Sequence, residues 1–457
     1  MSTFKVTFAN GAQMPTGSNF LVELGGRKIL IDCGLVQGER YSIPINREPF
    51  TYDTTSIDAL FVTHSHLDHV GRIPKLVRDG FKGKIVSTAP TRDIAELIMI
   101  DSMGVLSKEA KHENIEMLYE EKDVLNSMHL WNDIVEYEKP YTFKTDDGDA
   151  LFVFHDSGHI LGSAIIEIRY KGKNLAFTGD LGNTPSPLMK DTTKLTNIDY
   201  LVMESVYGDR NHKDREKRVD ILKDSLISTI NNGGSVVIPA FSIERTQELM
   251  LAFNELVENK QIPEVPIYLD SPLGINVTKV YKKYDSWFNE NVEKTIKSGD
   301  DIFAFKGLIK TPTSEDSKNI SNDERPKVII AGSGMSNGGR VLFHEARYLP
   351  DPKSSVIIVG YQSAYTLGRR LVDNAKEVII HGEVIPVRAH IINIHGFSAH
   401  KDSDHLVEFV SSTASTLKKI FVVLGEPKSA YFLGQRLFEE YGVAVNVPEK
   451  NDVLILD

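Results

Sequence analysis

Three histidines and an aspartate stand close together in the segment HSHLDH at residues 64–69. The segment follows the apolar run Ala59–Thr63, which we expect to form a buried strand. A loop that leaves a strand can direct alternate side chains to different sides, so His64 and His66 can bind one metal ion while Asp68 and His69 face a second. The spacing therefore predicts a metal centre of the kind that activates water for hydrolysis.

Two later segments supply further ligands. His159 stands between glycines in GHILGS, residues 158–163, and Asp180 ends the segment FTGD after another expected strand. Taken alone, such a histidine is typical of a turn or a core, and such an aspartate is typical of an Asx-turn or a helix cap. In a chain that already holds the histidine cluster, both are predicted metal ligands. Asp32, at the end of the expected strand Lys28–Asp32, is predicted to hold a ligating histidine in the correct tautomer, with a strand-end turn as the alternative.

The order of these residues resembles the metallo-β-lactamase superfamily, and the remainder of the chain resembles its nucleic-acid-processing branch, the β-CASP family. That branch carries an acid after the next strand, here Glu204 in MESVYG, and a histidine in a Phe-Ser-Ala-His segment, here His400. Further segments resemble the inserted β-CASP domain: DSPL from Asp270, GSGM from Gly332, GGR from Gly338, GYQ from Gly360 and TLGRR from Thr366. The resemblance runs from about residue 10 to the C-terminus. It is to bacterial and archaeal ribonucleases similar to the nuclease subunit of the cleavage and polyadenylation specificity factor.

The resemblance implies two zinc ions. The implied ligands are His64, His66 and His159 for one zinc, Asp68 and His69 for the other, and Asp180 as a bridge. It also implies a zinc-dependent ribonuclease in which a metal-activated hydroxide hydrolyses RNA phosphodiesters, mainly endonucleolytically and also from the 5′ end. His400 is expected to protonate the leaving 3′-oxygen while Glu204 holds its charged form, and Asp68 also counts as catalytic.

One position departs from the family pattern. The family carries a further histidine near the C-terminus as an added ligand of the second metal, and here that position is Leu424, which cannot bind zinc. The second metal site is therefore expected to bind its metal more weakly. This leaves open the alternative that the protein is an RNA-binding scaffold with an impaired metal site. The position of His381 in the chain does not match that of the missing ligand, so we do not expect His381 to replace it. His395 and His405 are expected to be surface or core residues. A metallo-hydrolase of small phosphoesters or thioesters is the other alternative.

The expected β-CASP part also carries candidate substrate contacts. Glycine-rich turns can present backbone N–H groups to a phosphate, and arginine suits phosphate contacts. The residues predicted to contact substrate phosphates are Ser333, Gly334, Arg340, Arg369 and Arg370. The sequence has no ladder of aromatic residues of the kind that reads bases, so we expect recognition of the backbone of single-stranded RNA more than of its sequence.

The elements that must position these residues are indicated by hydrophobic patterning. Short apolar runs in the first third of the chain predict strands, charged sequence from Thr91 to about Glu138 predicts helices, and strands return up to Tyr200–Met203. After Gly208 strands and helices alternate, which predicts a parallel sheet with helical cover. The polar stretch Thr313–Pro326 is expected to be a loop.

The expected fold class is α/β, a metallo-β-lactamase αββα sandwich with an inserted β-CASP α/β domain. We expect the first part of the metallo-β-lactamase domain at residues 1–207, the β-CASP domain at 208–385, and the C-terminal part of the first domain at 386–457.

Composition sets the remaining limits. The chain has 457 residues, one cysteine, 14 histidines and a formal net charge of −11. The length predicts two to three domains, and the single cysteine, Cys33, excludes an internal disulfide or a multi-thiolate zinc site. We expect a cytoplasmic protein with no membrane partner and leave open whether it forms a homo-oligomer. The acidic balance opposes non-specific binding to nucleic acid, so affinity for RNA is expected from two zinc ions and a few arginines.

Overall fold

The computed structural model describes residues 4–38, 42–213, 215–363 and 365–456. The chain divides into two compact units, one of Met1–Asn211 with His400–Asp457 and one of His212–Ala399. The sequence places the divisions after residues 207 and 385. By contact, residues 386–399 group instead with the second unit, because strand β19 (His390–Asn393) pairs in parallel with β16 (Ser355–Ile358).

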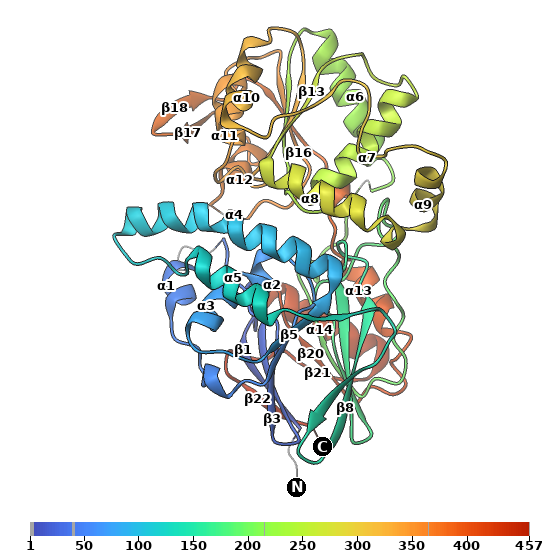
Figure 1. Cartoon of the computed structure of the whole chain (residues 1–457). Helices are drawn as coiled ribbons and strands as arrows, with labels where there is room; N and C mark the ends of the chain where they lie inside the picture. The colour runs from blue at the N-terminus through green and yellow to red at the C-terminus, as the bar shows by residue number, and fades with distance from the viewer. Residues whose placement is uncertain (1–3, 39–41, 214, 364, 457) are drawn as a thin grey trace. The chain divides into compact units, whose positions relative to one another are not determined.

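The first unit contains two seven-stranded sheets (Figure 1). The first sheet has the order β22 (Val453–Ile455), β1 (Lys5–Asn10), β2 (Asn19–Leu24), β3 (Arg27–Ile31), β4 (Ala59–Phe61), β5 (Lys84–Thr88), β6 (Asp133–Val135). The second has the order β21 (Ala444–Asn446), β20 (Lys419–Val422), β11 (Tyr200–Met203), β10 (Lys173–Phe177), β9 (Ala164–Tyr170), β8 (Gly148–Asp156), β7 (Tyr141–Thr145). The strands expected from apolar runs are thus present.

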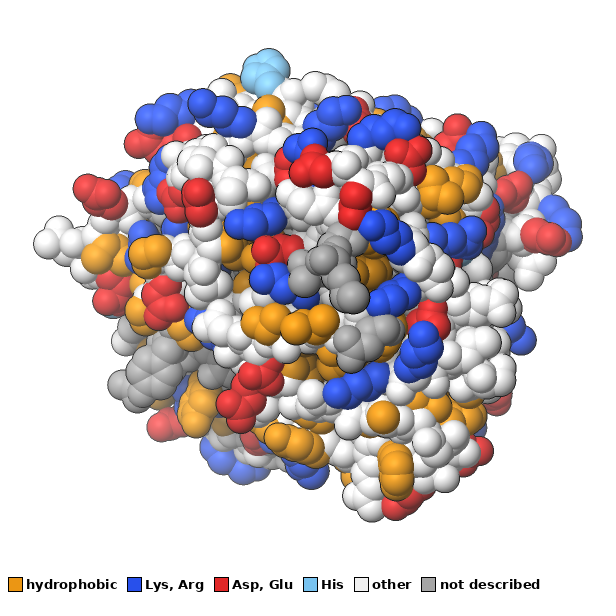
Figure 2. Space-filling model, turned by 90° about the horizontal axis from the view of Figure 1, so that it is seen from below, with side chains coloured by type: hydrophobic (Ala, Val, Ile, Leu, Met, Phe, Trp, Pro, Cys, Tyr) orange, Lys and Arg blue, Asp and Glu red, His pale blue; other side chains and the backbone are white. Residues whose placement is uncertain are grey.

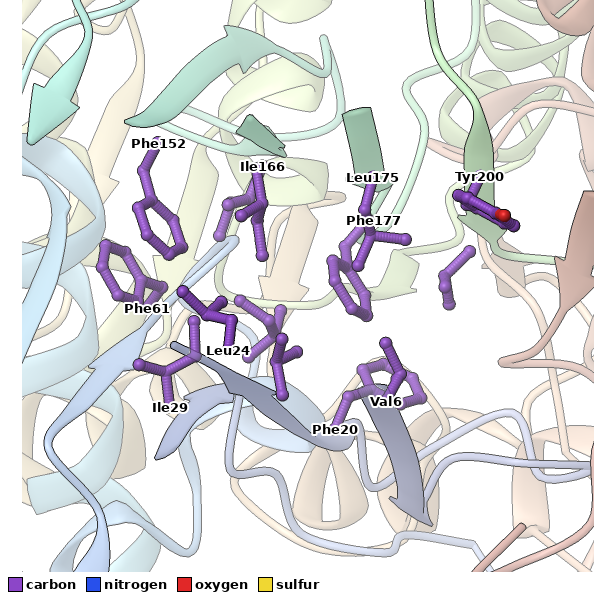
Figure 3. Close-up of a cluster of buried hydrophobic side chains, with 14 of the residues drawn as sticks. Val6, Phe20, Leu24, Ile29, Phe61, Phe152, Ile166, Leu175, Phe177 and Tyr200 are labelled. Carbon is purple, nitrogen blue, oxygen red and sulfur yellow. The ribbon is translucent and has the colours of Figure 1, made fainter. Parts of the chain in front are cut away.

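The inner faces of these sheets pack against each other and bury one shared core (Figure 3). Phe61 of β4 stacks on Phe152 of β8 with ring centroids 3.9 Å apart and planes 5° from parallel. The outer face of each sheet is covered by helices, because alternate residues of the strands are apolar on that side too. Leu30 and Leu60 of the first sheet pack with Trp131, and Ile420 of the second packs with helical leucines. The expected αββα sandwich is confirmed.

The helices of the first unit are α1 (Ser42–Arg47), α2 (Leu67–Val70), α3 (Ile73–Arg78), α4 (Ala89–Glu113), α5 (Glu121–Leu130), α13 (Ser403–Val410) and α14 (Pro427–Tyr441), with the 3-10 turn η1 (Thr54–Ser56). Helix α4 begins where the Thr88 hydroxyl accepts from the Thr91 N–H and ends at Asn114, whose left-handed backbone (φ 52°) terminates it. The helical stretch expected to continue to about Glu138 ends earlier, because residues 133–135 pair with β5 as β6.

The second unit has a six-stranded sheet in which all neighbours are parallel, as expected. Its strands are β14 (Leu308–Lys310), β13 (Ile267–Asp270), β15 (Val328–Ala331), β12 (Val236–Pro239), β16 and β19. A separate hairpin joins β17 (Glu377–Ile380) to β18 (Glu383–Pro386). The helices are α6 (Arg218–Asn231), α7 (Arg245–Glu258), α8 (Pro272–Lys283), α9 (Glu290–Lys297), α10 (Ser314–Asn319), α11 (Val341–Tyr348) and α12 (Leu367–Val372), with 3-10 turns η2 (Asp285–Trp287), η3 (Ile320–Asn322) and η4 (His395–Phe397).

The stretch 313–326, expected to be a loop, is partly helical. Thr313 and Asp316 form a capping box in which each side chain accepts from the backbone N–H of the other, and this starts α10. The polar composition concealed the helix because α10 has no buried side chain. Within the described residues, no helix combines the length and the apolar character needed to cross a membrane.

Candidate metal centre

The predicted ligands come from loops at one end of the two sheets of the first unit. The histidine cluster follows β4, His159 lies between β8 and β9, and Asp180 follows β10. Asp32 follows β3, which is parallel to β4, and Glu204 follows β11, which is parallel to β10. Strands that run in the same direction bring their carboxyl ends to a common edge, which is why residues distant in sequence meet here.

Four side chains meet most closely: His64, His66, His159 and Asp180. His66 Nδ1 lies 3.2 Å from His64 Nε2 and 3.2 Å from His159 Nε2. Asp180 Oδ2 lies 3.4 Å from His64 Nε2 and 3.5 Å from His159 Nε2. These four distances are edges of one small polyhedron of donor atoms.

The polyhedron has the dimensions of a zinc site. Zinc bound tetrahedrally at about 2.0–2.1 Å from nitrogen or oxygen separates its ligand atoms by about 3.3–3.4 Å. The observed edges of 3.2–3.5 Å match that separation. Three imidazoles with one carboxylate are also a donor set that zinc accepts, so the residues present fit the metal.

The protonation of two of these histidines suits a metal ligand. Burial, with the neighbouring His64, lowers the pKa of His66 well below its usual value. Burial, with the neighbouring His400, does the same to the pKa of His159. Both imidazoles are therefore neutral near pH 7, which is the form that binds a metal.

His69 and Asp180 form the second part of the centre. His69 Nε2 lies 3.4 Å from Asp180 Oδ1. His64 faces the other carboxylate oxygen, Asp180 Oδ2. Asp180 thus presents one carboxylate oxygen to His64 and the other to His69. Asp68 lies in the first turn of α2 and is partly buried, and among the described residues it belongs to neither of the two closest groups of potential ligands. Burial raises the pKa of Asp68, against the lowering effect of His69.

Asp32 holds His69, as the sequence predicts for a supporting carboxylate. Its Oδ2 lies 2.7 Å from His69 Nδ1. Burial alone would lower the pKa of His69, but Asp180 and Asp32 outweigh it and raise that pKa well above its usual value. His69 is therefore protonated between two carboxylates, and it would have to lose a proton to bind a metal.

Sequence reasoning missed the residues that hold Asp32 itself. Thr63 donates from its backbone N–H to Asp32 Oδ1 and from its hydroxyl to Oδ2, each at 2.8 Å. Ser18 donates to Oδ2 at 3.0 Å. The loop of His159 has a similar support, because Ser163 Oγ accepts from the His159 N–H at 3.1 Å. The available signals were the position of Thr63 directly before the cluster and of Ser163 within GHILGS.

His400, which is partly exposed, and the buried Glu204 form a pair beside the ligands. His400 Nδ1 lies 3.2 Å from Glu204 Oε1, and the His400 ring centroid is 4.6 Å from that of His159. Glu204 is fully buried and also accepts from the Leu181 N–H at 2.6 Å. Burial favours the neutral form of His400, but Glu204 and the more distant Asp180 outweigh it and raise the pKa of His400 to about 9. The imidazole is therefore protonated at neutral pH.

Comparisons with known proteins give the chain three matches in order along its length. Residues 15–239 match the metallo-beta-lactamase superfamily, 246–371 the Beta-Casp domain, and 384–448 the Zn-dependent metallo-hydrolase RNA specificity domain. The chain is 33% identical over 427 residues to Ribonuclease TTHA0252 of Thermus thermophilus, a match that covers 93% of this chain and 94% of that protein. The chain belongs to the metallo-β-lactamase superfamily. It carries the β-CASP domain, as the motifs predicted.

Other proteins match over nearly the same span. The RNase J-like protein of Methanocaldococcus jannaschii is 33% identical, with 98% of both chains covered. The Transcription termination factor FttA of Methanosarcina mazei is 31% identical over 95% of this chain and 69% of that protein. A crystal structure of a protein of unknown function from Enterococcus faecalis V583 matches with a TM-score of 0.58 at 14% identity, covering 100% of both chains, which shows a shared fold.

In this metallo-β-lactamase domain Leu424 is a core residue. Its side chain is 2% exposed and packs in the core between the sheets, and a Cβ on Gly11 would lie 3.0 Å from Leu424 Cδ2. Its backbone is left-handed (φ 50°), and its carbonyl accepts from the Ser205 N–H at 3.3 Å. Position 424 is thus adjacent to the segment of Glu204 and carries an apolar side chain, which cannot bind a metal.

The histidines weighed as substitutes have other partners. His381 lies in the turn between β17 and β18, and its ring is 4.6 Å from that of Phe343. His395 Nε2 lies 3.3 Å from Asn393 Nδ2, and His405 Nδ1 lies 2.6 Å from Asp402 Oδ1.

The predicted phosphate contacts all lie in the second unit, mostly with internal partners. Ser333 Oγ accepts from the Asn337 N–H, and Gly334 O accepts from Gln362. Arg340 donates to Asp270 at 2.7 Å and to two backbone carbonyls. Arg369 pairs with Asp373, and Arg370 donates to the Glu377 carbonyl. Any contact with a phosphate would have to use the N–H groups of these residues that the internal hydrogen bonds do not occupy.

Proposed function

We propose that this protein is a zinc-dependent ribonuclease that hydrolyses phosphodiester bonds of single-stranded RNA, mainly within the strand and also from the 5′ end. The observation that carries the proposal is the set of four donor atoms at zinc spacing, with the His400–Glu204 pair beside it. The names of the relatives, a ribonuclease and an RNase J-like protein, support the substrate class. The single cysteine supports a cytoplasmic location.

The proposal assigns the ligands in two sets. His64, His66 and His159 would hold one zinc, Asp68 and His69 the other, and Asp180 would contact both. Bound zinc supplies a Lewis acid that stabilises charge on phosphoryl oxygens and brings the pKa of water close to neutrality. Asp32 would keep the His69 ring oriented and its Nδ1 proton in place.

His400 would act as the general acid. Its Nδ1–H is held by Glu204, and its other ring nitrogen, Nε2, would donate the proton to the leaving 3′-oxygen. Glu204 would keep the imidazole charged, because a buried carboxylate stabilises the imidazolium. Because the pKa of His400 is about 9, the imidazole would carry the proton that it donates at neutral pH.

RNA would bind through its backbone. The face of the protein seen in Figure 2 mixes Lys and Arg with Asp and Glu rather than presenting one continuous basic surface. With a net charge of −11, that pattern favours contacts to the metal ions and to residues such as Ser333, Gly334, Arg369 and Arg370 over general attraction.

Leu424 supports a second candidate, an RNA-binding scaffold with a weakened metal site. Loss of a protein ligand should lower the affinity for the second zinc by at least the 10- to 100-fold typical of changes around a metal ligand. A hydrolase of small phosphoesters or thioesters has less support, because it gives no role to the Beta-Casp and RNA specificity matches.

Cleavage of end-labelled single-stranded RNA by wild type, Leu424→His and His400→Ala, with zinc content measured for each, separates these candidates. The ribonuclease proposal expects wild type to cut and His400→Ala to lose activity with its zinc retained. If wild type is inert and Leu424→His cuts, the scaffold describes the natural protein. If all three cut equally, the site is assigned wrongly.

A further inference from the structure

Phe241 lies at the carboxyl edge of the six-stranded sheet of the second unit, and its side chain is partly in solvent. It follows the end of β12 by two residues, and 37% of its surface is exposed. Phenylalanine is normally buried, because its ring contributes a large apolar area to a core. The proposed ribonuclease mechanism gives this exposed ring no role.

The pairing of β12 places Phe241 between two other loops. Strand β12 pairs in parallel with β15 on one side and with β16 on the other. The register joins Pro239, the last residue of β12, to Ala331, the last residue of β15. Two residues further along, Phe241 therefore lies beside the loop that contains Gly334 and, on its other side, beside the loop that begins near Gly360.

Both neighbouring loops place a glycine against the ring. A Cβ on Gly334 would lie 2.6 Å from Phe241 Cδ2, and a Cβ on Gly360 would lie 3.1 Å from Phe241 Cε2. A side chain at Gly334 would therefore collide with the ring. Gln362 joins the two loops, because its Nε2 donates to the Gly334 carbonyl at 2.9 Å and to the Gly360 carbonyl at 3.2 Å. The ring is thus held along its Cδ2–Cε2 side, which fixes the direction of the surface that it exposes.

The ring lies at a position where α/β sheets bind ligands. The connection from β12 runs to β13 in one direction across the sheet, and the connection from β15 runs to β16 in the other direction. Right-handed crossovers then put α7 and α11 on opposite faces of the sheet, as Figure 1 shows. Ligands of open parallel sheets bind at the carboxyl ends of the strands, where the connections change direction in this way. Phe241 follows the strand at which that change occurs.

Hydroxyl groups lie at the same edge of the sheet. Ser242 directly follows Phe241, and its Oγ lies 3.1 Å from Ser271 Oγ. A Cβ on Gly332 would lie 3.7 Å from Ser242 Oγ and 3.6 Å from Ser271 Oγ. Hydroxyl groups both donate and accept hydrogen bonds. The combination suits a planar ligand with an apolar face and a polar edge, which describes a nucleobase.

We propose that a base of the RNA substrate stacks on the Phe241 ring. This inference rests on the proposed ribonuclease function, because it names a further contact for the same RNA. Stacking on an aromatic ring holds single-stranded nucleic acid and tolerates any base, since every base has a π-face. The contact adds affinity to the backbone contacts without requiring positive charge, which suits a chain with a net charge of −11.

Binding of short single-stranded RNA to the metal-loaded full chain tests the proposal, in a protein that carries His400→Ala so that the RNA stays intact. Adding Phe241→Leu keeps an apolar side chain but removes the ring, and it should weaken binding about 5- to 150-fold. Phe241→Tyr keeps a ring and should bind as tightly as the parent protein. Phe343→Leu is the matched control and should leave binding unchanged. Phe343 is also exposed in the second unit, at 64%, but its ring contacts that of His381, with 4.6 Å between centroids.

Abasic nucleotides separate stacking from a structural effect of the substitution. When each nucleotide of the RNA is made abasic in turn, the loss caused by Phe241→Leu should disappear at the one position whose base stacks on the ring. If Phe241→Leu leaves binding unchanged, or weakens it equally at every abasic position, no base stacks on this ring and the inference is wrong while the proposed function stands. If the His400→Ala protein binds no RNA, the inference and the proposed function both fail.

Discussion

Replacing Glu204 by glutamine should move the pH dependence of RNA cleavage. The pKa of His400 is about 9 because Glu204 outweighs burial, so the general acid stays protonated until the pH rises through that value. Glutamine keeps an oxygen that can accept from the Leu181 N–H but loses the charge. Without that charge the pKa should fall to about 6.5, the usual value for histidine, because only Asp180 and Asp68 then oppose the effect of burial.

The size of the effect is set by the protonated fraction of His400. At pH 8 this fraction falls from about 0.9 to about 0.03, so the rate should fall about 30-fold, whereas at pH 6 it falls by less than about 1.5-fold. Single-turnover cleavage of labelled RNA at both pH values measures the two losses. Glu167→Gln is the matched control, because Glu167 is also buried and accepts from a histidine, with His155 Nε2 at 2.8 Å. An equal loss at pH 6 and pH 8 would refute the electrostatic role of Glu204.

Three further expectations concern the centre and the core. Asp32→Asn should lower the affinity of the His69 metal about 10- to 100-fold in a zinc titration, and unchanged affinity would mean that the 2.7 Å contact does not support the ligand. Exhaustive chelation should lower the melting temperature, because ligand binding to the folded state stabilises it, and identical melting curves would count against a bound metal. Phe61→Ala should lower the free energy of unfolding, measured in urea, by about 3–5 kcal/mol, because it removes the ring that stacks on Phe152. A loss below about 1 kcal/mol would contradict the role of this ring pair in the core.

The sequence predicted the ligands better than their supports, for a physical reason. His64, His66 and His159 are recognisable because imidazole is rare and its spacing is distinctive, and their meeting results from strands that end at one edge. Thr63 and Ser163 are common residues whose role depends on hydrogen bonds across the fold, so no local pattern marks them.

The same limit applies to the secondary-structure elements. Apolar runs predicted the buried strands, but α10 is exposed and was concealed by its polar composition. Boundaries shifted for a related reason, since β19 joins its sheet through backbone hydrogen bonds that carry no side-chain signature.

His400 is the first residue of the segment that returns to the first unit after the long insertion. It is fixed there by backbone pairing, since it forms an antiparallel bridge with Gly182 and the Lys401 N–H donates to the Leu181 carbonyl at 2.9 Å. The proposed proton donor therefore also stands at one of the two covalent junctions between the units. A mechanical force transmitted along the chain from the second unit would reach His400 through the peptide bond between Ala399 and His400. The main-chain contacts with Gly182 and Leu181 would hold His400 in place against that force.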